Sequence, residues 1–198
     1  MKPPLAALAT GERDLEHQST RITRSTETHT EHHNPDAGPR RAASVAFVRD
    51  THSGIQIYFS KRPAHFRYFP GAFVFPGGRV EDFDADTRGT ACREVMEEIG
   101  VDITPDGLAL LRETYTARHA GPVYHLFIYA CAVLGDMPTA PNPEEVEAEA
   151  WLTAGEALSQ LDLPYQIMAA VQSISQFETV AALMLALEQG SFPGDDSF

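Results

Sequence analysis

The segment GTACREVMEEIGV, residues 89–101, places Glu94, Glu97 and Glu98 within five positions of a predicted helix that ends before Gly100. Successive helix residues are separated by about 100°, so Glu94 and Glu98 share one face and Glu97 lies beside them. Like charges at this spacing cost a few tenths of a kcal/mol per pair. A cation relieves that repulsion, and carboxylate oxygens suit Mg²⁺ or Mn²⁺. The segment therefore predicts a divalent metal site.

The segment FPGG, residues 75–78, precedes this helix. Glycine has no side chain to cover the backbone, so the carbonyl of Gly77 is a candidate additional oxygen ligand. Arg93 adjoins Glu94, and we expect it to pair with a carboxylate of the loop before the helix, for which Asp84 is the best candidate. The predicted site thus combines the helix, the glycine turn and the loop between them.

Apolar and aromatic runs elsewhere predict a mixed sheet. Strands are expected at residues 42–50 and 55–62 as a hairpin, at 71–81 with a break at Pro-Gly-Gly, at 108–118, at 122–134 and around Trp151. Helices are expected from Asp86 or Thr87 to Ile99, from the N-cap residue Thr153, and as one long or two shorter helices before Gly190. Helices on both sides of the sheet give an α/β/α sandwich, an α/β fold.

Residues 1–41 are rich in Thr, Glu, Arg and His and show no sustained apolar periodicity. Such a segment buries too little apolar surface to offset the entropy of ordering. We expect a flexible N-terminal tail over 1–41 and a single domain over 42–198 that includes the C-terminal helices.

The excess negative charge lies in this domain. Residues 42–198 contain nine Lys/Arg and 22 Asp/Glu, whereas residues 1–41 contain six of each. An acidic surface repels the nucleic-acid backbone and anionic membranes. Polymeric nucleic acid and membrane are therefore not expected as partners.

The only cysteines, Cys92 and Cys131, have no CxxC spacing, and the N-terminus shows no secretory pattern. These features predict a reduced, cytoplasmic protein. No apolar run approaches the roughly 20 residues that span a bilayer. The apolar segment 167–187 is expected to cover the sheet, mainly with its first half, or to form the face of a homodimer.

Positive charge gathers around the glycine turn. Four of the nine Lys/Arg in residues 42–198 fall within nineteen positions, namely Lys61, Arg62, Arg67 and Arg79. Cations beside a metal site neutralise and orient a diphosphate. Arg62, Arg67, Arg79 and Gly78 of the turn are the candidate substrate-binding residues.

The segment GGRVEDFDADTRGTACREVMEEIGV resembles the signature of the Nudix hydrolases, enzymes that cleave a nucleoside diphosphate linked to another group. The REVMEEIGV half matches at every fixed position, and the resemblance covers residues 42 to about 165. The usual spacing places the leading glycine at Arg79 and the first glutamate at Ala85, so this chain has one extra residue between Gly78 and Arg93.

The longer spacing is similar to that of the coenzyme A diphosphatase branch. That branch has two arginines and a glycine before Phe-Pro-Gly-Gly, and acidic residues three and six places after it. Here these are Arg62, Arg67, Gly71, Glu81 and Asp84, with Pro63 and Glu81 in place of the usual serine and aspartate. The resemblance implies coenzyme A or an acyl-coenzyme A as substrate.

The resemblance also implies functional residues. Metal would be held by the Gly77 carbonyl with Glu97, Glu98 and Glu94, and Glu94 is metal ligand or base. Some members carry a further acidic residue just before a tryptophan-containing strand, where this chain has Glu149, with its neighbours Glu144, Glu145 and Glu147 as further candidates. The candidate catalytic residues are therefore Glu94, Arg93 and Glu149, with Asp84 as a supporting loop carboxylate and Mg²⁺ or Mn²⁺ as cofactor.

Two alternatives stay open. One is hydrolysis of ADP-ribose, a nucleotide sugar or a dinucleotide; the proline that ADP-ribose-preferring relatives tend to carry beyond the signature is missing from TYTARHAG. The other is a non-catalytic binding module with the Nudix fold. Loss of catalysis should first remove the metal-binding glutamates, which are all retained here.

Overall fold

The computed structural model describes residues 38–116 and 123–191. The first strand begins at Arg40, two residues before the expected start of the domain, and the rest of the predicted tail, residues 1–37, lies outside the described residues. The elements in chain order are β1 Arg40–Thr51, β2 Gly54–Lys61, β3 Phe73–Val74, β4 Gly77–Arg79, α1 Thr87–Ile99, a 3₁₀ turn Pro105–Gly107, β5 Leu108–Tyr115, β6 Tyr124–Ala132, β7 Ala148–Thr153, α2 Ala154–Gln160, α3 Tyr165–Ile174 and α4 Val180–Glu188.

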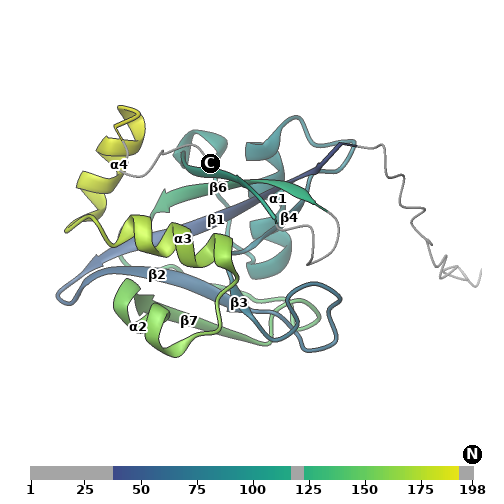
Figure 1. Ribbon diagram of the computed structural model, residues 1–198, viewed down its shortest axis with the longest axis horizontal. Coiled ribbons are helices and arrows are strands. Elements are labelled where there is room, and N and C mark those ends of the chain that lie inside the picture. The colour runs from purple at the N-terminus through teal and green to yellow at the C-terminus, as the bar shows by residue number, and fades with distance from the viewer. Residues whose placement is uncertain (1–37, 117–122, 192–198) are drawn as a thin grey trace, which may run out of the picture. The chain divides into compact units, whose positions relative to one another are not determined.

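The strands form one mixed sheet in the order β3-β2-β1-β6-β5, in which β4 also pairs with β1 and β7 also pairs with β2 (Figure 1). The hairpin of β1 and β2 is present as predicted, and β1 pairs with β6 in parallel while the other pairs are antiparallel. β1 is therefore the central strand, and it connects the glycine turn at β4 to the rest of the sheet.

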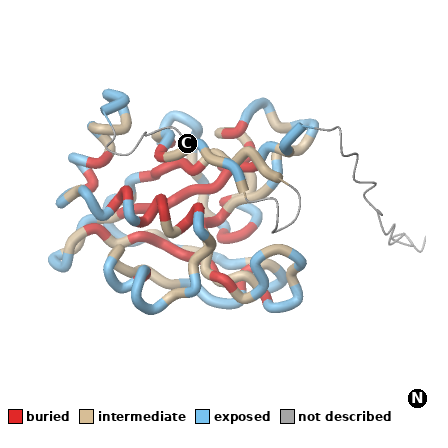
Figure 2. Tube along the Cα trace, in the orientation of Figure 1, coloured by how far each residue is buried: buried red, intermediate tan, exposed pale blue. Residues whose placement is uncertain are grey.

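Alternate residues of β1 and its neighbours serve two hydrophobic cores, one on each face of the sheet. Val45 and Phe47 pack with Tyr58 and with Val95 and Ile99 of α1. The opposite face packs against α2, α3 and α4, through the buried residues Ala46, Val48, Ile57, Phe59, Ala157, Ile167, Val171, Ile174 and Leu183. Figure 2 shows the buried stretches along the central strands and α3. The predicted α/β/α sandwich is confirmed.

Local signals set the ends of α1 as the sequence predicts. The Asp86 carboxylate accepts a hydrogen bond from the N–H of Gly89 at 2.8 Å, which caps the first turn. Gly100 ends the helix with φ 68°, and its N–H donates to the carbonyl of Met96. Because both ends of α1 are fixed, the helix cannot rotate freely about its axis. The face that carries the glutamates therefore has a fixed direction.

The C-terminal apolar segment forms two helices, α3 and α4. Ile167, Val171 and Ile174 of α3 are buried in the core, which agrees with a covering role for the first half of the segment. On α4, Leu183 is buried but Leu185 is 53% exposed. A dimer through α4 stays a prediction. Within the described ranges, no helix has the length and apolar character needed to cross a membrane.

β4 approaches β1 so closely that Gly77 admits no side chain. Its φ is +154°, and an added Cβ would lie 2.2 Å from the carbonyl oxygen of Ala43 and 2.5 Å from the Cα of Ser44. Both obstacles are backbone atoms of the central strand, which cannot move aside. Glycine at this position is therefore a requirement of the pairing between β4 and β1.

The substitution Gly77→Ala should destabilise the protein by about 1–3 kcal/mol or more, because backbone strain adds to the clash with β1. Gly155→Ala is a matched control, since Gly155 lies in α2 and an added Cβ there meets nothing within 4 Å. In a helix that change should stabilise by roughly 0.5–1 kcal/mol. Urea unfolding of the two variants measures the difference. Equal stabilities would contradict the close approach of β4.

Candidate metal and diphosphate site

The glutamates of α1 lie against the beginning of β4. Glu98 is only 7% exposed, and one of its carboxylate oxygens accepts a hydrogen bond from the N–H of Gly77 at 3.0 Å. The carboxylate of Glu94 occupies the space where a side chain on Gly78 would be, since an added Cβ would lie 2.4 Å from it. The two glycines therefore have different roles. Gly77 allows β4 to lie close to the backbone of β1, and Gly78 leaves space for the carboxylate of Glu94.

Arg93 connects the loop carboxylate to the glutamate face. Its guanidinium contacts Asp84 at 2.9 and 3.0 Å, so the predicted pair is present. The same group lies 2.9 Å from both Glu94 and Glu97 and donates to the carbonyl of Arg79 at 3.1 Å. Arg93 thus supplies one of the charges that lets these carboxylates lie together.

Asp84 is well fixed for a loop residue. Its side chain is 4% exposed and accepts hydrogen bonds from the Thr90 hydroxyl and the N–H of Glu81, both at 2.9 Å, besides those from Arg93. The hydrogen bond with Arg93 is the main reason why the pKa of Asp84 lies well below its usual range. The same bond raises the pKa of Arg93, which stays charged.

Glu98 has no comparable cationic contact. Burial raises the pKa of its carboxyl group to about 8; the hydrogen bond from Gly77 opposes this shift, and the negative charge of Glu94 adds to it. The pKa of Glu94 is also raised, first by its own burial, although Arg93 opposes the shift. Burial therefore outweighs the nearby positive charge at both carboxyl groups, although Glu94 has an ion pair with Arg93 and Glu98 has none among the described residues.

The three carboxylates share one face, as predicted, but they do not yet surround one point. Glu97 is 53% exposed in its side chain and is held by Arg93, while Glu98 faces Gly77. Within residues 38–116 and 123–191, no group of three His, Cys, Asp or Glu side chains has a ready-made metal geometry. A bound ion would have to draw the carboxylate of Glu97 away from Arg93.

Arg62 is the predicted substrate-binding cation that comes closest to these groups. Burial lowers its pKa, and the negative charges of Glu98, Glu145 and Glu94 act in the opposite direction, so all three carboxylates are within electrostatic reach. Arg62 also organises its own loop: its Nε donates to the carbonyl of Tyr68 at 3.1 Å, and its guanidinium lies 4.6 Å from the ring centroid of Phe66.

The other predicted cations are more exposed. Arg67 lies on the loop between β2 and β3, 5.4 Å from the ring centroid of Tyr68. Arg79 is at the end of β4, with its side chain 3.6 Å from Glu81 and its carbonyl bonded to Arg93. Both are exposed and therefore accessible to a ligand.

The acidic loop before β7, residues 142–147, is held by a backbone hydrogen bond at each end. The N–H of Asn142 donates to the carbonyl of Glu98, and the N–H of Glu147 donates to the carbonyl of Lys61, both at 2.8 Å. Between these anchors lies Glu145, whose charge raises the pKa of both Glu94 and Glu98. Sequence reasoning preferred Glu149 and could not rank Glu145 above it, because both lie in one run of acidic residues.

Glu149 itself is exposed at the start of β7, and its carboxylate lies 2.5 Å from the hydroxyl of Tyr58. Trp151, two residues later, packs on Tyr58 with 5.5 Å between ring centroids and lies under the guanidinium of Arg49 at 4.1 Å. Trp151 thus packs against its neighbours in the sheet, while Glu149 lies on the face that α1 covers.

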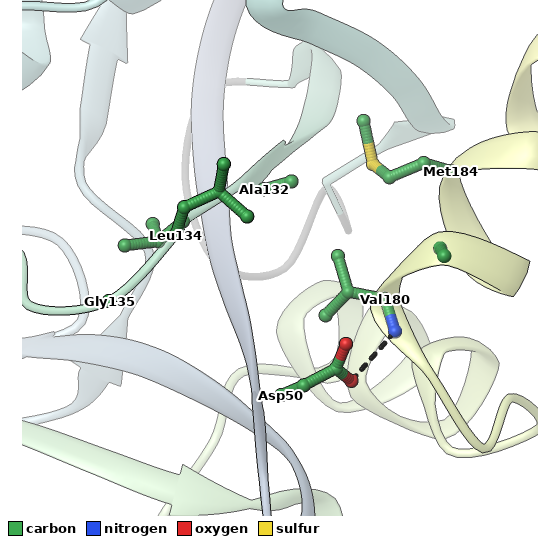
Figure 3. Close-up of a pocket in the computed structure, with 8 residues that line it drawn as sticks. Asp50, Ala132, Leu134, Gly135, Val180 and Met184 are labelled. Carbon is green, nitrogen blue, oxygen red and sulfur yellow. Dashed lines mark hydrogen bonds between the residues drawn. The ribbon is translucent and has the colours of Figure 1, made fainter.

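A separate apolar hollow of about 400 Å³ lies between α4 and the end of β6 (Figure 3). It is lined by Leu134, Val180 and Met184 among others, and Asp50 at its rim accepts a hydrogen bond from the N–H of Val180 at 2.9 Å. None of the predicted site residues lines it, so it is not part of the carboxylate site.

Solved structures share this fold. A Nudix hydrolase from Alicyclobacillus acidocaldarius superposes with a TM-score of 0.66 at 17% identity, covering 77% of this chain and 97% of that one. The NUDIX domain of Shewanella oneidensis NrtR, complexed with ADP ribose, superposes with a TM-score of 0.59 at 14% identity, covering 72% and 89%. At these identities the likeness supports the fold alone.

Sequence relatives are more specific. Nudix hydrolase 22, chloroplastic, from Arabidopsis thaliana is 32% identical over 56% of this chain and 36% of its own length. The peroxisomal coenzyme A diphosphatase ndx-8 from Caenorhabditis elegans is 30% identical over 61% and 52%. This chain therefore spans only about a third to a half of these relatives. A family model described as the NUDIX domain matches residues 38–170, two thirds of the sequence, and the chain belongs to the Nudix family.

Proposed function

We propose that this protein hydrolyses the diphosphate bond of a nucleoside-diphosphate-linked substrate with the help of a divalent cation. The observation that carries the proposal is the buried carboxylate of Glu98, which lies beside Glu94 with no cationic hydrogen-bond partner among the described residues. Family membership supports the same reaction class, because Nudix hydrolases generally use divalent metal ions and act on diphosphate bonds.

The residues present fit such an ion. The donors are hard oxygen atoms, which Mg²⁺ and Mn²⁺ prefer, and a bound ion would favour the ionised form of the buried Glu98 carboxyl group. We propose that the carbonyl of Gly77 and the carboxylates of Glu94, Glu97 and Glu98 hold it. When bound, the ion supplies charge neutralisation for the phosphates and a more acidic water.

The remaining residues orient these groups and the substrate. Arg93, held by Asp84, fixes where Glu94 and Glu97 can lie. Arg62, whose charge already reaches the carboxylates, is placed to bind a phosphate of the substrate, and Arg67 and Arg79 offer further positive charge at the surface. Gly78 keeps the space beside Glu94 open. Glu94 or Glu149 accepts the proton of the attacking water.

The preferred substrate is coenzyme A or an acyl-coenzyme A. Two findings support it: the loop Lys61–Phe75 has the spacing of the coenzyme A branch, and one relative is named as a coenzyme A diphosphatase. ADP-ribose is the second candidate, since a structural neighbour was solved with that ligand. A cytoplasmic location stays a prediction, because the names of relatives include chloroplastic and peroxisomal proteins.

Stability should depend on pH through Asp84. Its pKa in the folded state lies below the value of about 3.9 in unfolded chains, so its contribution is present above pH 4 and is lost as pH falls through the folded pKa. Asp84→Asn should lower the free energy of unfolding at pH 7 by roughly 2–4 kcal/mol, since Arg93 loses its buried partner. Urea unfolding from pH 7 to pH 3 measures this. The difference in the free energy of unfolding between the wild type and Asp84→Asn should become smaller towards pH 3. A constant difference would contradict the assignment.

The reaction is tested by incubating the protein and Mg²⁺ or Mn²⁺ with coenzyme A, ADP-ribose, NADH and diadenosine polyphosphates. We expect turnover, with coenzyme A used best. Glu97→Gln and Glu98→Gln should each lower kcat/KM by at least about 100-fold, as removal of a charge-stabilising group commonly does.

Glu188→Gln is the control for these variants, because Glu188 is exposed on α4 and distant in sequence from the site. Its activity should equal that of the wild type. No turnover of any compound would favour a non-catalytic binding module. Activity within a few-fold of the wild type in both glutamate variants would remove the metal assignment.

A further inference from the structure

Tyr58 is a buried tyrosine whose hydroxyl reaches the exposed residue Glu149. The residue is 1% exposed, and its ring is fixed by Phe47 and Trp151, with 6.2 and 5.5 Å between ring centroids. Its hydroxyl lies 2.5 Å from Oε1 of Glu149. Burial raises the pKa of the hydroxyl, and the charges of Glu149 and Glu98 raise it further. The hydroxyl therefore stays protonated and donates to Glu149.

The strand register places this pair on the side of the sheet that α1 covers. Tyr58 is opposite Trp151 and Ser60 is opposite Glu149, so Tyr58 and Glu149 point to this same face. The charge of Glu98 on α1 also raises the pKa of the Tyr58 hydroxyl, so this hydroxyl is within electrostatic reach of the proposed metal-binding helix.

Charged groups surround the pair on several elements. Lys61 of β2 contacts Glu147 at 2.5 Å, Arg49 of β1 stacks on Trp151, and Glu145 and Arg62 lie on the two adjoining loops. Among the described residues, Tyr58 is the hydrogen-bond partner of Glu149, and it engages only Oε1. Oε2 is therefore available for another group.

The hydroxyl is not needed for packing. A phenylalanine would make the same ring contacts with Phe47 and Trp151, and a buried hydroxyl is favourable only when it is hydrogen-bonded. Tyr129 gives the comparison within the same core: it is also buried, but its hydroxyl lies 2.7 Å from that of Thr87, at the other end of α1. Of these two hydroxyls, that of Tyr58 is the one bonded to a carboxylate.

We propose that Tyr58 is a positioning residue that holds Glu149 as the proton acceptor of the hydrolysis, an inference that rests on the proposed function. Its hydrogen bond fixes Oε1 so that Oε2 faces the attacking water. As the water oxygen forms its bond to phosphorus, Oε2 takes the proton. The phosphoric anhydride bond breaks, and its electron pair leaves with the departing phosphate.

The test compares Tyr58→Phe with Tyr129→Phe, two removals of one buried hydroxyl from the same hydrophobic core. Tyr58→Phe should lower kcat by about 10-fold, the effect of losing a hydrogen bond to a charged group, and leave KM and the Kd for Mg²⁺ within about twofold. Tyr129→Phe should leave kcat within about twofold of the wild type.

Glu149→Gln is a second variant that should not disturb folding, because Glu149 is exposed. It should lower kcat by about 100-fold or more, as loss of a general base does. If the wild type turns over a diphosphate but Tyr58→Phe and Tyr129→Phe lower kcat equally, or Glu149→Gln keeps kcat within a few-fold, the inference is wrong. A wild type that cleaves no diphosphate would instead overturn the proposed function.

Discussion

The buried carboxylate of Glu98 is the constraint on which the site depends. It is held where β4 runs so close to β1 that glycine is required, and its one hydrogen bond from Gly77 does not offset the loss of water. The fold thus places an acidic group where it is stable as an anion only with added positive charge. In the proposed function, a divalent ion between this carboxylate and its neighbours would supply that charge.

Arg93 provides part of the positive charge that the helix glutamates need when no ion is bound. Its single guanidinium contacts Asp84, Glu94 and Glu97, so two of the three helix glutamates are compensated within the chain and Glu98 is not. The arrangement separates two tasks. Asp84 and Arg93 maintain the loop and the helix in register, and the remaining uncompensated charge is directed to a ligand. The positive charge of Arg62 also reaches Glu98 and Glu94.

Much of this was predictable from local signals. The cap residues Asp86 and Gly100, the pairing of Arg93 with Asp84, and the break at Pro-Gly-Gly each follow from chemistry within a few positions of the chain. The contribution of Glu145 was not ranked above its acidic neighbours, because it depends on how a distant loop is fastened to Glu98 and Lys61. Tyr58 was missed for the same reason: its partner Glu149 lies 91 positions away, and in sequence Tyr58 reads as an ordinary strand residue.

Calorimetric titration of the purified protein with Mg²⁺ or Mn²⁺, repeated in buffers of different ionisation enthalpy, tests the central claim most directly. The account predicts binding with release of a proton near pH 7, because a carboxyl group with a pKa of about 8 must ionise to hold the ion, and weaker binding without that release in Glu98→Gln. Failure of either ion to bind, even with a diphosphate ligand present, or equal binding and proton release by Glu98→Gln, would contradict it.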